Sequence, residues 1–336
     1  MNLRKLRDID VSPIGMGCMG LSHGYGEIPD ESYSIGAIRR AHDFGCTFFD
    51  TAEAYGPNLL SENRGHNERI VGETVRDFRK EVILATKLHI HTEEAREKGL
   101  EALMREHLTA LLKRLETDYA DIYYLHRINA DIPVEDVAEV MGKLIRDGLI
   151  RGWGLSQVDV DTIERANAVT PLSAVQNIYS MLERGVEERV IPYCLAHDIG
   201  VVPFSPIASG FLSGRVTKDS DFSHSDDVRK FVPQLSEENM AANRPILDLL
   251  EEYAQRKNAT KAQISLSWVL HKYPNVVPIP GSKNMERIIE NLGAWNVSLT
   301  DDEFCAMERA LDEIPVHGHR GFVEQQGSGM ANWNRK

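Results

Sequence analysis

Short apolar runs rich in β-branched and aromatic residues recur along the chain, and segments with a helical pattern separate them. Eight such runs occur, at residues 13–19, 46–52, 82–87, 120–126, 150–156, 173–179, 200–206 and 275–281. The intervening segment 99–118, GLEALMREHLTALLKRLETD, has leucines that return every three or four residues, which is the spacing of an amphipathic helix. Near-continuous apolar strands that alternate with helices are typical of a parallel sheet covered by helices.

The order of these units favours a barrel. Eight strand–helix units follow one another, and no linker rich in Pro, Gly or Ser divides them. This arrangement favours a closed (β/α)8 TIM barrel over two domains, with an open doubly wound sheet as the alternative. We therefore expect residues 1–336 to form a single α/β barrel domain. The opening residues LRKLRDIDVSPIG predict a small β-hairpin before the first barrel strand, placed to close the barrel floor.

Two segments depart from the repeating pattern. The interval between residues 206 and 275 is too long for one helix. It holds a polar stretch at 213–231, followed by helical patterns near 237–257 and 260–272. A long loop after a barrel strand is usually functional or disordered. The tail at 313–336, rich in Gly, His and Gln, is expected to be irregular.

Composition limits the class of protein. Apolar residues make up 42% of the chain and charged residues 26%, and no run of about 18 apolar residues is present to span a membrane. The N-terminal segment lacks the apolar core of a secretory signal, and the four cysteines stand far apart. We therefore expect a cytoplasmic protein with no disulfide framework and no metal site. The net charge of −13 disfavours nucleic acid as a partner, so an anionic ligand must meet a local basic patch.

The stretch GMGCMG at 15–20 matches the G-x-G-x-x-G pattern of a Rossmann turn. That turn must open a helix, with an acidic residue about 20 positions later for the ribose. Here further glycines and Pro29 delay any helix until about Asp30, and Arg39 and Arg40 stand where the acid is needed. The glycines therefore do not predict a Rossmann fold.

Polar residues end most of the predicted strands. These strand ends are Asp50, Lys87, His126, Ser156, Gln176 with Asn177, Ser205, and Ser282 with Lys283. Each of them has an ordinary structural explanation when taken singly, as does Tyr55 as a loop aromatic. In a barrel, however, the C-terminal strand ends converge on one rim, where active sites lie. An acid, a base, an imidazole and a phenol on that rim indicate a catalytic site.

The same residues occur in motifs that together resemble the aldo-keto reductases. The motifs are FFDTAEAYG, NERIVG, LATK, YYLH, GLS, VQNIYS, FSPIASGFLSG and PIPGSKNMERIIEN, in this order, and the match runs from about residue 3 to 312. The resemblance implies a barrel that binds NADPH in an extended conformation without a Rossmann fold, and that reduces aldehydes or ketones to alcohols. It also implies a monomer or a weak homo-oligomer acting on a small carbonyl substrate.

The resemblance further implies a catalytic tetrad of Asp50, Tyr55, Lys87 and His126, and all four identities are intact. Reduction of a carbonyl needs a hydride and a proton, and a phenol with a pKa of about 10 is a poor acid at neutral pH. A nearby ammonium stabilises the phenolate, so Lys87, held by Asp50, would make Tyr55 a better proton donor. His126 would donate a hydrogen bond to the carbonyl oxygen and fix its angle.

The cofactor-binding residues implied by the resemblance lie along the same rim. Those expected around the nicotinamide and its carboxamide are Gly17, Cys18, Met19, Ser156, Gln157, Gln176 and, stacked on the ring, Phe204. Those expected along the long loop and over the pyrophosphate are Ser205, Pro206, Ile207, Gly210, Leu212, Gly214 and Arg215. Those expected near the 2′-phosphate and the adenine are Gly281, Lys283, Arg287, Glu290 and Asn291. Two cations at a helix N-terminus in an acidic protein favour NADP.

Some positions depart from the family pattern. Gln157 stands where the family usually has Asn, and Gly281 replaces a lysine found in some branches, so Lys283 must carry more of the phosphate interaction. The segments HRINADIP, at 126–133, and HGHRGFVEQQG, at 317–327, belong to the variable substrate loops.

Two other classes share parts of this pattern. Regulatory proteins like the potassium-channel β subunits have the same fold and keep the tetrad, although the chain shows no long N-terminal extension. A barrel enzyme that uses a metal or a Schiff base at Lys87 is the other alternative. No cluster of His, Asp and Glu ligands favours the metal, whereas Asp50 and Tyr55 do not exclude the Schiff base.

Overall fold

The computed structural model describes residues 2–321, and the rest of the predicted irregular tail, residues 322–336, lies outside the described residues. The strands are β1 Arg4–Leu6, β2 Ile9–Val11, β3 Met16–Gly17, β4 Phe48–Asp50, β5 Ile83–Leu88, β6 Ala120–Leu125, β7 Ile150–Ser156, β8 Ala174–Gln176 and β9 Gly200–Val201. The helices are α1 Glu31–Asp43, α2 His66–Val75, α3 Thr92–Lys98, α4 Leu100–Arg114, α5 Val134–Arg146, α6 Val160–Val169, α7 Val190–Ala196, α8 Glu237–Ala242, α9 Arg244–Lys257, α10 Lys261–Lys272, α11 Met285–Leu292 and α12 Asp301–Glu313. In the part of the chain that is described, no helix is long and apolar enough to cross a membrane.

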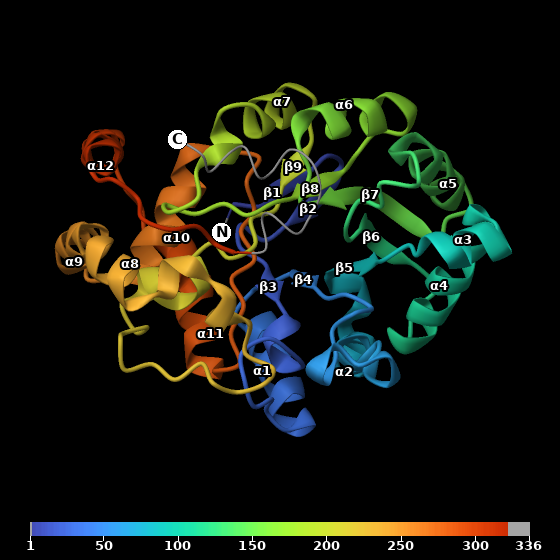
Figure 1. The fold of residues 1–336 in the computed structure, drawn as a ribbon, viewed down its shortest axis with the longest axis horizontal. Helices are drawn as coiled ribbons and strands as arrows, with labels where there is room; N and C mark the ends of the chain where they lie inside the picture. Colours follow the sequence, from blue (N-terminus) through green and yellow to red (C-terminus); the bar gives the residue numbers. More distant parts are fainter. Residues whose placement is uncertain (1, 322–336) are drawn as a thin grey trace.

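Seven strands, β3 to β9, form one parallel sheet in chain order. An eighth segment, 275–281, lies between β9 and β3: the Val277 amide donates to the Val201 carbonyl at 2.8 Å, and the Gly15 amide donates to the Pro278 carbonyl at 3.0 Å. The strand predicted here is present only as isolated bridges, because its two prolines have no N–H to give to a ladder. The sheet therefore closes on itself inside a ring of helices (Figure 1), and the predicted barrel is confirmed.

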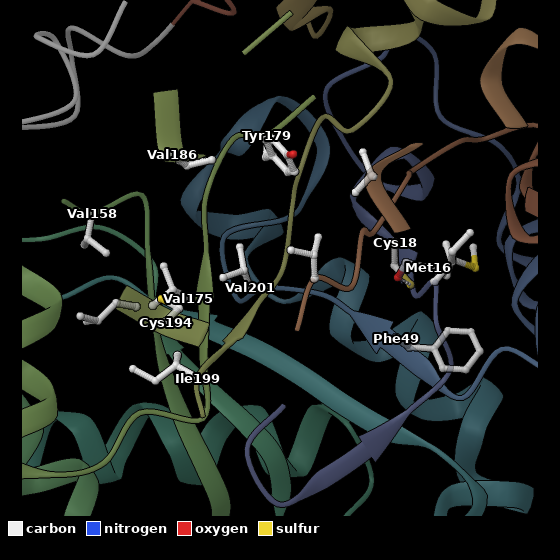
Figure 2. Packing of buried hydrophobic residues seen from close by; sticks show 14 of the residues in the cluster. Met16, Cys18, Phe49, Val158, Val175, Tyr179, Val186, Cys194, Ile199 and Val201 are labelled. Carbon is white, nitrogen blue, oxygen red and sulfur yellow. Dashed lines mark hydrogen bonds between the residues drawn. The ribbon is translucent and has the colours of Figure 1, made fainter. Parts of the chain in front are cut away.

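Successive side chains along each barrel strand face opposite sides of the sheet. The inward-facing residues of β4, β5, β6 and β8 form an apolar cluster inside the barrel that includes Phe48, Ala85, Ile122, Tyr124 and Ala174. Their chain neighbours pack instead in the larger cluster between sheet and helices, which includes Phe49, Leu84, Tyr123 and Val175. Figure 2 shows part of this outer layer, to which β8 contributes Val175, β9 contributes Val201 and α7 contributes Cys194. Burial on both faces explains why the barrel strands are almost continuously apolar.

The predicted N-terminal hairpin is present, with β1 and β2 paired antiparallel. Leu6, Ile9 and Val11 belong to the cluster inside the barrel, so the hairpin closes the barrel floor. The Arg4 guanidinium fixes it there by donating to the Tyr273 carbonyl at 2.7 Å, just beyond α10.

The insertion before the eighth barrel segment contains three helices, α8, α9 and α10, where the sequence pattern predicts two. The predicted helix at 237–257 is interrupted at Asn243, because Pro245 in the first turn of α9 has no N–H with which to continue α8. Helix α10 matches its predicted bounds closely. It begins with a capping box in which Thr260 and Gln263 satisfy each other's backbone amides.

Replacing Gly200 by Ala should destabilise the protein by displacing the hairpin. A Cβ at this position would lie 2.9 Å from the Leu6 Cα and closer still to its side chain, so the backbone of the floor must shift. Overpacking of this kind costs about 1–3 kcal/mol. Thermal unfolding monitored by circular dichroism measures the loss.

Gly36→Ala is the matched control for this test. Gly36 lies inside α1, where a Cβ meets only the Met285 side chain at 3.6 Å, and Ala is the better helix former. The control should unfold at the wild-type temperature or above it. An unfolding temperature for Gly200→Ala equal to that of the control would contradict the closed floor.

Candidate active site

The alternation along the barrel strands brings an acid and a base together inside its C-terminal end. Asp50 lies two residues beyond the inward-facing Phe48, and Lys87 lies two residues beyond Ala85. Asp50 is 2% exposed and Lys87 is fully buried. Lys87 Nζ donates to Asp50 Oδ1 at 2.5 Å and to the Thr51 carbonyl at 2.7 Å. The ammonium therefore has two fixed oxygen acceptors beneath the rim.

Tyr55, in the loop after β4, adds a third acceptor. Its hydroxyl oxygen lies 3.3 Å from Lys87 Nζ. The loop is held by Asn67 at the start of α2, whose amide donates to the Tyr55 carbonyl at 3.0 Å. The Asn67 side chain also accepts from Thr51 Oγ1 at 2.6 Å. Residues of the DTAEAYG and NERIVG motifs, which are separated in the sequence, therefore hold each other in place in the structure.

A buried charge network supports this loop from behind. Glu53 Oε2 lies 2.8 Å from His107 Nδ1, and the Arg114 guanidinium reaches Glu53 at 3.3 Å and Glu68 at 2.6 Å. Thr86 Oγ1 donates to Glu68 at 2.6 Å. Helices α2 and α4 are thereby joined to the segment that carries Tyr55.

His126 follows β6 and is 7% exposed. Its ring meets Tyr55 edge-on with 5.7 Å between centroids, and the His89 ring lies 4.4 Å away on the same measure. Burial, together with the charges of Arg127 and Lys87, holds the pKa of His126 well below its ordinary value. The imidazole is therefore neutral at pH 7 and can donate one hydrogen bond without carrying a charge.

The charge on Lys87 follows from its partners. Burial alone would lower the pKa of Lys87, but Asp50 and Tyr55 outweigh it and the pKa is raised. Burial raises the pKa of Tyr55, and the Lys87 ammonium opposes that rise. The effect of Lys87 on the phenol thus has the direction expected from the sequence, although burial exceeds it.

A cavity of about 450 Å³ opens over these residues. Asp50, Tyr55 and His126 line it, whereas Lys87 lies beneath them. Most of the cofactor-binding residues expected from the sequence line it as well: Gly17, Met19, Ser156, Gln157, Gln176, Phe204, Ser205, Pro206, Ile207, Gly210, Arg215, Gly281, Lys283, Arg287 and Asn291.

Four of the expected cofactor-binding residues do not line the cavity. Cys18 and Leu212 are buried in the outer core, and Gly214 ends a 3-10 turn in the left-handed conformation. Glu290 pairs with Arg215 at 2.6 Å, which ties the long loop to α11.

Gln157 has an unusual environment. Its φ is +58°, and both its Nε2 and its Oε1 are buried without a hydrogen-bond partner among the described residues. Buried amides are normally satisfied, and this one lines the cavity. Gln176, by contrast, already donates to Asp50 Oδ2 at 2.8 Å. The free amide of Gln157 is therefore suited to a ligand that offers both a donor and an acceptor.

The polar loop after β9 covers part of the cavity. The Val228 amide donates to the Gly24 carbonyl at 3.1 Å, and the Gly24 amide donates to Asp226 Oδ2 at 3.4 Å. His23 Nδ1 also contacts the Asp226 carboxylate, and both side chains are buried. The loop is thus joined to the segment after β3, which also lines the cavity.

Several residues that were not singled out as site residues in the sequence also line the cavity. They are His23, Tyr25, His89, Arg127, Arg229 and Arg320. Arg229 lies in a 3-10 turn and the others lie in loops. Arg127, Arg229 and Arg320 fall in segments already marked as variable or polar loops, but no periodicity marked the individual positions. Within residues 2–321, no group of three or more His, Cys, Asp and Glu residues could hold a metal ion.

The family model described as the aldo/keto reductase family matches residues 13–312. The chain belongs to this family of oxidoreductases. It is 34% identical over 328 residues to a probable aldo-keto reductase 1 of Glycine max, covering 96% of this chain and 91% of that protein.

Solved aldo-keto reductases have the same fold. The glycerol dehydrogenase AKR11B4 of Gluconobacter oxydans superposes with a TM-score of 0.81 at 25% identity, covering 94% of this chain and 97% of that one. An aldo/keto reductase of Klebsiella pneumoniae, crystallised with NADP and acetate, gives a TM-score of 0.70 at 28% identity over the same shares.

Replacing Lys87 by Met should destabilise this aldo/keto reductase in a pH-dependent way. Removing one partner of a buried ion pair costs about 3–5 kcal/mol. Burial raises the pKa of Asp50, and Lys87 opposes this rise. Without Lys87, the pKa of Asp50 in the folded variant therefore lies further above its value in the unfolded chain. The folded variant then binds a proton more readily than the unfolded chain. Its deficit in unfolding free energy is therefore largest at alkaline pH and shrinks as the pH falls.

Urea unfolding of the wild type and Lys87→Met at about pH 5.5 and about pH 8.5 measures this difference. The double variant Lys87→Met with Asp50→Asn has no carboxylate to titrate, so its deficit should not change between the two pH values. If Lys87→Met loses the same unfolding free energy at both pH values, Asp50 and Lys87 do not form the buried ion pair described above.

Proposed function

We propose that this protein reduces aldehydes or ketones to alcohols with NADPH, and that Tyr55 gives the proton to the carbonyl oxygen. The observation that carries the proposal is the place of the Tyr55 hydroxyl. It lies 3.3 Å from the buried Lys87 ammonium and lines the cavity beside the neutral imidazole of His126.

The proton transfer follows from these contacts. When Tyr55 gives up its proton, the phenolate forms next to Lys87 Nζ, and this contact stabilises the anion. Asp50 keeps the ammonium charged and fixed in place. His126, being neutral, cannot be the acid, but its ring N–H can donate to the developing alkoxide. Tyr55 is thus the residue of the site best suited to be the general acid.

The cavity residues fit a nicotinamide cofactor. NADPH, when bound, supplies the hydride that completes the reduction. The unpartnered amide of Gln157 matches a carboxamide, which has one donor group and one acceptor. Phe204 offers a ring for stacking. Lys283 lies just before α11 and Arg287 in its first turn, at a helix N-terminus where a phosphate is favoured. The NADP and NADPH bound by the Klebsiella pneumoniae relatives support the same assignment.

A Schiff base at Lys87 does not fit this site. An amine nucleophile must be unprotonated and accessible. Lys87 is fully buried, donates to three oxygens and has a raised pKa.

The experiment that tests the proposal follows NADPH absorbance with a panel of aldehydes and ketones, with the alcohol identified by chromatography. Alcohol should form in an amount equal to the NADPH consumed. Tight NADPH binding without turnover across the panel would favour a cofactor-binding regulatory protein instead.

Replacing Tyr55 by Phe should lower kcat/KM by about 100- to 10,000-fold, the usual effect of losing a general acid. NADPH affinity, measured by fluorescence, should change by less than about threefold. Tyr119→Phe is the control: Tyr119 stacks on Arg79 away from the cavity, and Phe preserves the ring. A Tyr55→Phe variant that keeps more than about a tenth of wild-type kcat would remove Tyr55 from this role.

Replacing Arg287 by Ala should weaken NADPH binding by about 1–3 kcal/mol, as expected for charge-assisted hydrogen bonds to a phosphate. NADH, which lacks the 2′-phosphate, should be much less affected. Arg40→Ala is the control, because Arg40 lies near α11 but pairs with Glu286 and does not line the cavity. Equal losses for NADPH and NADH, measured by fluorescence titration, would place the phosphate site elsewhere.

A further inference from the structure

Cations line the cavity although the chain is acidic overall. The chain has a net charge of −13, yet Asp50 is the one acidic residue among the described residues that line the cavity, and it is paired with Lys87. The lining cations are Arg127, Arg215, Arg229, Lys283, Arg287 and Arg320.

Four of these six cations already have a partner or a place in the proposed function. Arg215 pairs with Glu290, and Arg229 pairs with Asp227. Lys283 precedes α11 and Arg287 lies in its first turn, at the proposed phosphate site. Arg127 and Arg320 are left, and neither guanidinium forms an ion pair within residues 2–321.

Arg127 lies beside the catalytic residues. Its Nη1 donates to the His126 carbonyl at 2.5 Å and to Ser156 Oγ at 3.0 Å. Its guanidinium carbon is 6.0 Å from the centroid of the Phe204 ring. Its Nε and Nη2 have no partner among the described residues. A guanidinium has five donors, so the edge that can grip a carboxylate with two parallel hydrogen bonds is free.

Arg320 approaches the same region from the segment after α12. It is 7% exposed, and its Nε donates to Ser205 Oγ at 2.8 Å, next to Phe204. Burial lowers the pKa of Arg127 to about 10, and the charge of Arg320 acts in the same direction. Arg127 thus stays protonated at pH 7, and the two positive charges are close enough to affect each other.

Two such cations are costly to hold together. A charge removed from water without a partner destabilises the fold, and two like charges repel. The charge of the nearby Glu183 carboxylate offsets part of this cost for Arg320, because it opposes the lowering of the Arg320 pKa by burial. Arg127 has no ion-pair partner among the described residues. An anion placed between them would relieve both costs. The two segments that carry Arg127 and Arg320 are also the two that the sequence marks as substrate loops.

We propose that Arg127, assisted by Arg320, binds a carboxylate of the substrate, so that the carbonyl compounds reduced here are oxo acids. This inference rests on the proposed reductase function and specifies its substrate class. Arg127 holds the carboxylate through its free Nε–Nη2 edge while the carbonyl oxygen meets Tyr55 and His126. A carboxylic acid with a pKa of about 4 is fully ionised at neutral pH.

The test compares 2-, 3- and 4-formylbenzoate with their methyl esters. Each pair has the same ring and aldehyde but differs in charge, and the three isomers vary the distance from aldehyde to carboxylate. In the wild type, kcat/KM for the acid should exceed that for its ester by at least about tenfold at one ring position. The acid-to-ester ratio within one variant cancels any general loss of activity.

Arg127→Met should lower this ratio by about 10- to 100-fold at the preferred ring position. Arg127→Lys should retain part of the acid-to-ester ratio, because an ammonium keeps the positive charge but lacks the two parallel N–H donors of a guanidinium. Arg320→Leu should lower it less than Arg127→Met. Arg96→Met is the control for a change of net charge, since Arg96 lies on the exposed face of α3 and is 69% exposed.

Equilibrium binding gives a second readout that needs no turnover. Benzoate, but not benzamide, should bind to the protein saturated with NADP, and Arg127→Met should abolish this binding in calorimetry. NADPH affinity of Arg127→Met should stay within about threefold of the wild type. A loss of NADPH affinity as large as the loss of acid preference would assign Arg127 to the cofactor and overturn the proposal.

The outcomes separate this inference from the function on which it rests. Reduction of the esters without preference for any acid, or a preference that survives Arg127→Met, overturns the carboxylate site alone. If neither acids nor esters are reduced, the reductase function fails. In that case, benzoate binding that depends on Arg127 would still support the anion site. If benzoate does not bind either, the anion site is overturned as well.

Discussion

The two-residue alternation of the barrel strands is the constraint on which the site depends. Phe48 and Asp50, Ala85 and Lys87, and Ala174 and Gln176 each occupy the same inward face of one strand. The apolar member fills the barrel, and the polar member emerges at its C-terminal end. A shift of one residue in any of these strands would turn the polar group into the helix layer and its outer neighbour into the barrel. The packing that fixes the register therefore also fixes the chemistry.

The buried pair of Lys87 and Asp50 is costly for the fold, since both groups lose their water. It is retained in an arrangement where every acceptor around the ammonium is fixed: one carboxylate oxygen, one backbone carbonyl and the Tyr55 hydroxyl. Gln176 satisfies the other carboxylate oxygen. The network of Glu53, Glu68 and Arg114 then holds the loop that carries Tyr55. The fold thus gives up some stability to hold one phenol beside one positive charge.

The barrel and the hairpin floor could be predicted from apolar periodicity, and Asp50, Lys87 and His126 could be placed at the rim by strand-end polarity, because these are local signals. Tyr55 lies in a loop, and its grouping with the other three as a tetrad came from the resemblance to the aldo-keto reductases. Prediction from the sequence was weaker where backbone geometry, rather than the apolar pattern, determines the local structure. The segment 275–281 has the apolar pattern of a strand, but its prolines interrupt the ladder. The ion pair between Arg215 and Glu290 had no signal in the sequence, because the fold of the long loop brings the two side chains together. Arg127 and Arg320 had no periodic signal, because loop geometry alone brings them to the cavity.

Placing Lys87 beneath the cavity and Arg127 within it separates two electrostatic tasks. Burial raises the pKa of Tyr55, and both cations oppose that rise, but an anionic ligand can neutralise only the cation that it can touch. Lys87 is fully buried and does not line the cavity, so its effect on the phenol persists whatever occupies the site. In the proposed mechanism, proton donation by Tyr55 does not depend on Arg127 alone, so an anion at Arg127 would leave that role to Lys87. Buried charges such as that of Lys87 are screened less than charges on the surface. A positive interior in an acidic protein also draws anionic ligands toward it.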